Sequence, residues 1–132
     1  MAEAVTHIIP SLDAPILPDG VIAYEDLKGE GDAPGTVAYV HYNGPTDQLA
    51  TMCTGMAVLE PGASPHKPHQ HPEEEFLMIS SGTGVIDVAG KLSEVGPGAI
   101  MYVGSMVSHG IVNTGAVPMT FFWAKWIAKG YE

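Results

Sequence analysis

Turn-forming residues recur along this chain at short intervals, and no segment shows the 3.6-residue apolar period of an amphipathic helix. The 132 residues include sixteen glycines and eleven prolines, which are too many for a helical protein. Between the turns lie runs rich in β-branched and aromatic residues. Many short strands joined by turns are typical of a sandwich or barrel. We therefore predict an all-β fold in a single domain, 1–132.

The strands are expected to follow one another from about residue 21 to the C-terminal segment. They are Val21–Tyr24, Thr36–Tyr42, Leu49–Leu59, Lys67–His71, Glu75–Ile79, Gly84–Val88, Ala99–Val103, Ser108–Asn113 and Met119–Ile127. Residues 1–20 are rich in proline, so we predict an N-terminal arm there. The apolar part of the arm, residues 7–9, either lies on the barrel or on a neighbouring subunit, or it frays.

The last predicted strand carries apolar residues on both faces. If Lys125 faces water, alternation assigns the remaining side chains to two sets. The interior set is then Phe122, Ala124 and Trp126, and the outer set is Phe121, Trp123 and Ile127. An apolar outer face favours coverage by a second subunit, so we expect a homodimer. The alternative is a strand buried on both faces, from which the flexible lysine reaches water.

The charge of the chain excludes several classes of partner. The formal net charge is −10, with five lysines and no arginine. Nucleic-acid binding needs clustered cations, so we expect no nucleic-acid partner. The missing arginine also removes the usual bidentate clamp for phosphate, which makes phosphosugars poor substrate candidates.

The location is predicted from what the sequence lacks. Cys53 is the single cysteine, so no intramolecular disulfide can form. The N-terminal residues do not resemble a secretion signal, and no apolar run reaches the length of a membrane-spanning helix. We expect a cytoplasmic protein without a membrane partner.

The clearest chemical signal is a pair of histidines two residues apart, His69 and His71, followed by glutamates at positions 73–75. Side chains two apart share one face of a strand. His109, on a distant predicted strand, adds a third imidazole. Three imidazole nitrogens and one carboxylate oxygen suit a divalent transition metal. The residues alone do not decide which glutamate takes part.

These residues belong to a wider pattern that resembles the two motifs of the cupin superfamily. One motif is a Gly, His-x-His, Glu, Gly string, and the other is a Gly, His, Asn string. In this sequence they are Gly62, His69, His71, Glu75 and Gly82, then Gly98, His109 and Asn113. The resemblance implies a cupin-type double-stranded β-helix, or jelly-roll barrel, with residues 49–127 as its core.

The resemblance also implies a ligand set for one divalent metal: His69, His71, Glu75 and His109. Glu75 is preferred among the three glutamates because it leaves the family's six residues before Gly82. Asn113 would be structural, at a strand end.

The sequence departs from the family pattern at two turns. One extra residue before the histidine pair places His66 in a loop, where we expect it at the barrel mouth or as an outer base. Gly104 and Met106 stand where the family prefers Pro and Gly. Those changes concern the turn that presents His109.

A divalent ion with three neutral imidazoles and one carboxylate keeps one positive charge and, if octahedral, two open positions. The cavity is expected to be apolar, lined by Leu77, Ile79, Val107 and Ile111. A small, fairly apolar substrate that chelates through oxygen fits such a site. The first hypothesis is therefore a small Fe(II) dioxygenase in which Glu75 also moves a proton. Mn, Zn, Ni and Cu suit the same ligands.

Two other functions remain open. In a non-redox lyase or isomerase, Zn, Mn or Ni polarises a carbonyl while Glu75, His66 or Tyr102 moves protons. In a binding or sensor protein, the metal only holds a small-molecule ligand. In every case imidazoles must lose their protons to bind a metal, so we expect metal loss on acidification through about pH 6.

Overall fold

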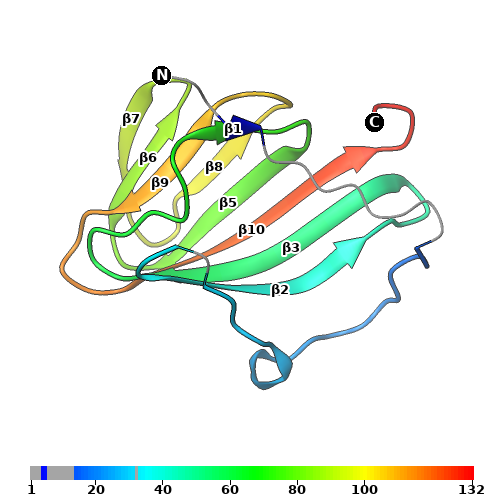
Figure 1. Cartoon of the computed structure of the whole chain (residues 1–132), viewed down its shortest axis with the longest axis horizontal. Helices are drawn as coiled ribbons and strands as arrows, with labels where there is room; N and C mark the ends of the chain where they lie inside the picture. Colours follow the sequence, from blue (N-terminus) through cyan, green and yellow to red (C-terminus); the bar gives the residue numbers. More distant parts are fainter. Residues whose placement is uncertain (1–3, 6–13, 32) are drawn as a thin grey trace.

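Two five-stranded β-sheets form the protein, as seen in a computed structural model that describes residues 4–5, 14–31 and 33–132 (Figure 1). The first sheet has the strand order β1-β4-β9-β6-β7, and the second has β2-β3-β10-β5-β8. The pairing of β1 with β4 is parallel, and the other strand pairings are antiparallel. This architecture is the all-β fold that the turn pattern predicts.

The element bounds follow the chain order. They are β1 (Ala4–Val5), η1 (Tyr24–Asp26), β2 (Thr36–Gly44), β3 (Leu49–Leu59), β4 (His69–Gln70), β5 (Glu74–Ser81), β6 (Gly84–Val88), β7 (Lys91–Val95), β8 (Ile100–Val103), β9 (His109–Asn113) and β10 (Met119–Ala128). The element η1 is a 3₁₀ helix of three residues. Within the described part of the chain, no helix is long and apolar enough to cross a bilayer.

The core lies between the two sheets and is built from side chains of both. Leu59, Ile79 and Met119 of the second sheet are fully buried, and Ile86 and Ile111 of the first sheet pack against them. Burying one such side chain stabilises the fold by about 1.5–3 kcal/mol. These contacts hold the sheets together and leave little freedom to the strands that carry the histidines.

The side chains expected to line a cavity are part of this core instead. Leu77, Ile79 and Ile111 do face inward, as predicted, but they are 6 % exposed or less and pack in the apolar cluster. Val107 is partly buried against the same cluster. The prediction of their direction is confirmed, and the structure shows them as part of the apolar core.

Two predicted strands agree with the structure to the residue, β3 and β6. The predicted strand at Val21–Tyr24 is wrong, since the described chain has no strand there and η1 begins at Tyr24. The apolar run Val21–Ala23 has no neighbouring strand to pair with, and Val21 is 97 % exposed.

The strand β7 was not among the predicted elements. Its first four residues are exposed and only Leu92 among them is apolar, so they give no alternating apolar signal. It pairs with β6 through the turn Ala89-Gly90. Both turn residues have positive φ, +52° and +87°, as a type I′ hairpin turn requires. The turn was therefore readable from the sequence, and the strand after it was not.

The facing of β10 is opposite to the predicted one. Phe121 and Ile127 are buried, and alternation places Trp123 and Lys125 on the same inner face. Gly55 of the neighbouring β3 leaves room for the Trp123 indole on this face, because a Cβ at position 55 would clash with it. The prediction fails because it assumed that a lysine must face water. The side chains predicted to lie inside are on the outer face: Phe122, Ala124 and Trp126.

The predicted arm is only partly within the described residues. Residues 7–9, whose contact with the barrel or with a neighbour was left open, lie outside them. From residue 14 the chain runs close to the end of β2. The Leu17 amide donates to the Pro45 carbonyl at 2.9 Å, and the Tyr42 hydroxyl donates to the Gly20 carbonyl at 2.7 Å.

Candidate metal centre

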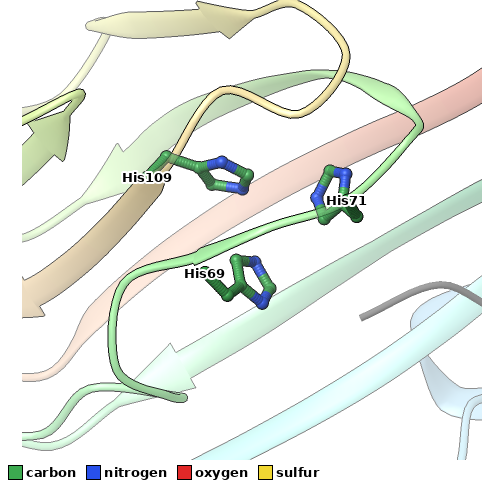
Figure 2. Close-up of side chains that lie close together, drawn as sticks. All are labelled: His69, His71 and His109. Atoms are coloured by element: carbon green, nitrogen blue, oxygen red, sulfur yellow. The ribbon is translucent and has the colours of Figure 1, made fainter. Parts of the chain in front are cut away.

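Three buried histidines meet where β4 and β9 lie side by side. In the antiparallel pairing of these strands, His69 is directly opposite His109. His71 follows β4 by one residue, so alternation returns its ring to the same side as His69. The ring centroids are 4.8–5.1 Å apart, and the three ring planes cross at 70–78°. Figure 2 shows the three rings gathered between the two chain segments.

The outer nitrogens of two of these rings are held by the backbone. The Nδ1 atom of His71 donates to the Glu73 carbonyl at 3.1 Å, and Nδ1 of His109 donates to the Val107 carbonyl at 2.9 Å. A carbonyl oxygen only accepts, so each proton sits on Nδ1. Each Nε2 atom is then left with its lone pair directed inward, which is the form that binds a metal.

Both inward nitrogens approach the same carboxylate oxygen. Oε1 of Glu75 lies 2.9 Å from Nε2 of His71 and 3.4 Å from Nε2 of His109. The His109 Nε2 atom is fully buried and makes no hydrogen bond within the described residues. A lone pair facing a carboxylate is repelled unless a proton or a cation lies between them.

The donor set therefore fits a divalent transition metal. The possible ligand nitrogens of His69, His71 and His109 all lie within 4.8 Å of one another. Bonds to imidazole nitrogen of about 2.0–2.1 Å would draw these atoms together by small side-chain movements. Burial of the three rings and of Glu75, none more than 7 % exposed, keeps water from competing for the ligands.

The electrostatics of the cluster follow from burial and from the shared carboxylate. Burial, together with the neighbouring histidines, lowers the pKa of His69 to about 3. Burial alone would raise the pKa of Glu75, but its contacts with His109 and His71 outweigh this effect and hold the pKa at about 2. Burial opposes protonation of His109, yet the Glu75 carboxylate and the Val107 carbonyl raise the pKa of His109. Glu75 is thus ionised and available as a ligand at neutral pH.

The turn that presents His109 is kept despite its departures from the family pattern. Met106 has a φ of +62°, a left-handed conformation that glycine adopts more easily. This explains why the family prefers Gly at that position. The Met106 amide donates to the His71 carbonyl at 2.8 Å, so the turn is tied directly to the segment that carries the histidine pair.

Asn113 fixes the other end of β9. Its side-chain nitrogen donates to the carbonyls of Leu59 and Val117 at 2.9 and 2.8 Å, and its oxygen accepts from the Gly115 amide. The residue is fully buried, so these three bonds satisfy the whole side chain. This is the structural position that the resemblance implies.

Of the two other candidate residues, His66 and Tyr102, the structure brings His66 close to the three histidines. The His66 ring stacks on the His69 ring with centroids 3.5 Å apart, and His66 is itself exposed to solvent. Tyr102 is not brought there. It lies on the outer face of β8, is 59 % exposed, and donates to Glu74 Oε1 at 2.6 Å. The structure therefore does not bring the Tyr102 hydroxyl to the three histidines, because alternation along β8 turns it outward.

Two charged residues beside the centre were missed or set aside by sequence reasoning. Glu73 is 2 % exposed, although it was weighed only as a less suitable ligand than Glu75. Lys125 lies on the inner face of β10 and pairs in register with Glu75. Its Nζ atom is 3.9 Å from Oε2 of Glu73. A lysine within a run of apolar residues was the signal that could have suggested a buried acidic partner.

The comparisons with known proteins agree with this fold. The family model of the Cupin domain matches residues 55–125, and the chain belongs to that family. No curated protein matches the sequence. The fold is the cupin-type jelly-roll barrel that the motifs imply.

Several solved structures share the fold at low sequence identity. An RmlC-like cupin from Shewanella frigidimarina is 16 % identical with a TM-score of 0.70, covering 86 % of this chain and 95 % of the other. The polyketide cyclase RemF from Streptomyces resistomycificus is 20 % identical with a TM-score of 0.67, covering 83 % and 80 %. A sugar phosphate isomerase of the cupin superfamily from Silicibacter pomeroyi is 20 % identical with a TM-score of 0.68, covering 81 % and 75 %.

Proposed function

We propose that the protein is a metal-dependent enzyme for a small, fairly apolar organic substrate that chelates through oxygen, with Fe(II)-dependent dioxygenation as the first candidate reaction. The observation that carries this proposal is the convergence of three imidazoles and one carboxylate oxygen, with two outer ring nitrogens already bonded to the backbone. Such a set of donors is preorganised to bind a cation. The fold itself does not require these polar groups to be buried together if no cation binds.

The residues of this chain have distinct tasks in that reaction. His69, His71, His109 and Glu75 would hold the metal. Bound there, Fe(II) supplies Lewis acidity toward an enolate or catechol-like ligand and reactivity toward dioxygen. The carbonyls of Glu73 and Val107 keep two of the rings in the ligating tautomer. Glu75 is the carboxylate placed to accept a proton from a bound hydroxyl group.

A cavity of about 500 Å³ is large enough for a small organic substrate, and its lining reaches Pro65, the neighbour of His66. The wall on β2 consists of Thr36, Ala38 and Val40, which pair in register with inward-facing residues of β3. Ile22, Leu27, Ala33 and Pro65 also line the cavity. The lining is mainly apolar, with charged groups at Asp26, Lys28 and Glu30.

Oxygen uptake tests the dioxygenase proposal. Protein loaded anaerobically with Fe(II) should consume dioxygen when mixed with a member of a panel of β-diketones and catechols, and metal-free protein should not. Turnover that continues at the same rate under strict anaerobiosis would exclude dioxygenation. Absence of uptake with a panel member that binds the Fe(II) form would count equally against it.

The position of His66 favours a second candidate, a lyase or isomerase. The Nδ1 atom of His66 donates to the Lys67 carbonyl at 2.9 Å, which leaves Nε2 able to accept a proton. The ring lies against that of His69, and His66 is exposed, so a bound substrate can reach it, as a base requires. In this reaction His66→Gln would lower kcat much more than metal affinity, and turnover would not need oxygen.

We also propose a homodimer formed through the outer face of the second sheet. Ile100 and Tyr102 of β8 are 64 % and 59 % exposed, and Phe76 of β5 stands beside them with its ring 6.5 Å from that of Trp126. A continuous apolar face of this kind favours a self-complementary contact. A cytoplasmic location completes the proposal, because the free thiol of Cys53 fits a reducing compartment.

One substitution on each sheet tests the dimer. Ile100→Glu should convert the protein to a monomer, because it would bury an unpaired charge in the apolar contact, whereas metal content should not change. The matched control is Leu92→Glu on β7, a side chain that is 67 % exposed on the other sheet. Light scattering coupled to gel filtration gives the mass. A wild-type monomer, or an Ile100→Glu dimer, contradicts the proposed interface.

A further inference from the structure

Lys125 is the half-buried cation of this protein. The structure describes all five lysines, and the other four are exposed: Lys28, Lys67, Lys91 and Lys129. Lys125 lies in the middle of β10, in register with Cys53 on one side and Glu75 on the other. Its side chain is 23 % exposed and points inward. A strand interior beside a proposed metal ligand is a costly position for an ammonium group without a partner.

Glu73 is the partner, and it also contacts a ring of the proposed metal centre. Its carboxylate has one oxygen, Oε2, 3.9 Å from the Lys125 Nζ atom and the other, Oε1, 3.8 Å from Nδ1 of His71. The main-chain carbonyl of the same residue accepts the hydrogen bond from that Nδ1 atom. Glu73 therefore meets the outer side of the His71 imidazole with both its backbone and its side chain.

The environment of the pair shows how the two charges are accommodated. A cavity of about 30 Å³ lies between them, lined also by the polar or polarisable side chains of Asn43, Thr51 and Cys53. This volume accommodates one water molecule, which can bridge charges separated by more than a direct hydrogen bond. The Glu73 carboxylate is 2 % exposed, and Lys125 supplies a countercharge at 3.9 Å.

We propose that Lys125 and Glu73 form a positioning pair that fixes the His71 imidazole for metal binding. The inference rests on the proposed metal centre, and it assigns the pair no contact with substrate. Lys125 holds the Glu73 carboxylate beside the outer edge of the His71 ring, and the Glu73 main-chain carbonyl accepts the proton of Nδ1, so that Nε2 points inward. Outer partners of this kind typically change metal affinity by about 10–100-fold when they are removed.

Whether removal of Lys125 weakens or strengthens metal binding distinguishes a positioning role from a purely electrostatic one. If Lys125 acted only through space, removal of its positive charge would strengthen the binding of a divalent cation. If it positions His71 through Glu73, its removal weakens binding. In the double variant Lys125→Met/Glu73→Gln the lost charges cancel, and the formal net charge stays at −10. A change in affinity of that variant reports the position of His71.

Titration of the metal-free protein with Co(II), followed by visible absorption and by calorimetry, gives the test. The double variant should bind Co(II) about 10–100-fold more weakly than the wild type, with a shifted absorption spectrum. The control is Lys91→Met/Glu94→Gln, the same charge change at exposed residues of β7. It should match the wild type. Circular dichroism checks that each variant is folded.

A single variant keeps the proposal falsifiable if the double variant does not fold. Lys125→Met should also weaken Co(II) binding, and Lys125→Arg should restore it to within about threefold of the wild type. If the wild type binds Co(II) and a folded double or single variant binds it equally well or more tightly, the positioning pair is overturned. The proposed metal centre is not affected by that result. A wild type that does not bind Co(II) overturns both.

Discussion

Replacement of His71 by alanine is expected to abolish stoichiometric metal binding. The Nε2 atom of His71 is 2.9 Å from Glu75, and its Nδ1 atom is held by the Glu73 carbonyl, so the ring is already oriented as a ligand. Loss of a ligand should cost more than the 10–100-fold typical of an outer partner, and we expect at least a 100-fold rise in the Kd for Co(II).

The control for this substitution is His41→Ala. His41 lies on β2 and is not part of the three-histidine group, and its ring stands 6.4 Å from that of Phe122. Calorimetric titration of both metal-free variants should show binding by His41→Ala and none by His71→Ala at micromolar protein. Equal binding by the two would mean that the metal is held elsewhere.

The second large effect is expected on acidification. A proton competes with the metal for each imidazole, and the pKa of His109 is raised by the Glu75 carboxylate, so competition there begins above the ordinary histidine range. Apparent metal affinity should therefore fall by at least about tenfold for each pH unit below 6.5. Titrations with Co(II) between pH 8 and 5 measure it. Full metal retention at pH 4.5 would contradict imidazole ligation.

The metal-free protein should also lose stability as the pH falls. The unfolded chain takes up a proton at His69 near its ordinary pKa of 6.5, whereas in the folded protein the pKa is about 3. Stability is then complete above pH 6.5 and is lost toward pH 3. Glu75, with a folded pKa of about 2, adds a loss between pH 4.5 and 2. His109 acts in the opposite direction, because its raised pKa favours the folded state at low pH.

We expect the Tm of the metal-free protein to decrease by at least about 5 °C between pH 7 and pH 4. The variant His69→Gln, which cannot titrate at that position, should show a smaller decrease over the same range. Thermal unfolding followed by circular dichroism in matched ionic strength provides the comparison. A Tm that rises on acidification would show that His69 is not the dominant group.

The sequence predicts the β architecture from local rules, and it predicts the meeting of the histidines from strand alternation together with the resemblance to the cupin motifs. Turn residues at short spacing indicate strands, and alternation places His69 and His71 on one side. The motif spacing connects them with His109, and the register of β4 with β9 sets His69 opposite His109. None of this needs knowledge of side-chain packing.

What could not be predicted depends on contacts between distant segments. The inward direction of Lys125 follows from its pairing across β10 with buried neighbours and from the buried carboxylate of Glu73. The outward direction of Tyr102 follows from alternation along β8, whose register is set by β5. A charge or a hydroxyl group considered alone gives no information about which face of a strand it occupies.

Elemental analysis of protein purified without chelators or a nickel column tests the central claim most directly. We predict close to one transition-metal ion per chain in the wild type, lost in the variant His71→Ala. Wild-type protein that carries no such metal and binds neither Fe(II), Co(II) nor Zn(II) at neutral pH would contradict the account.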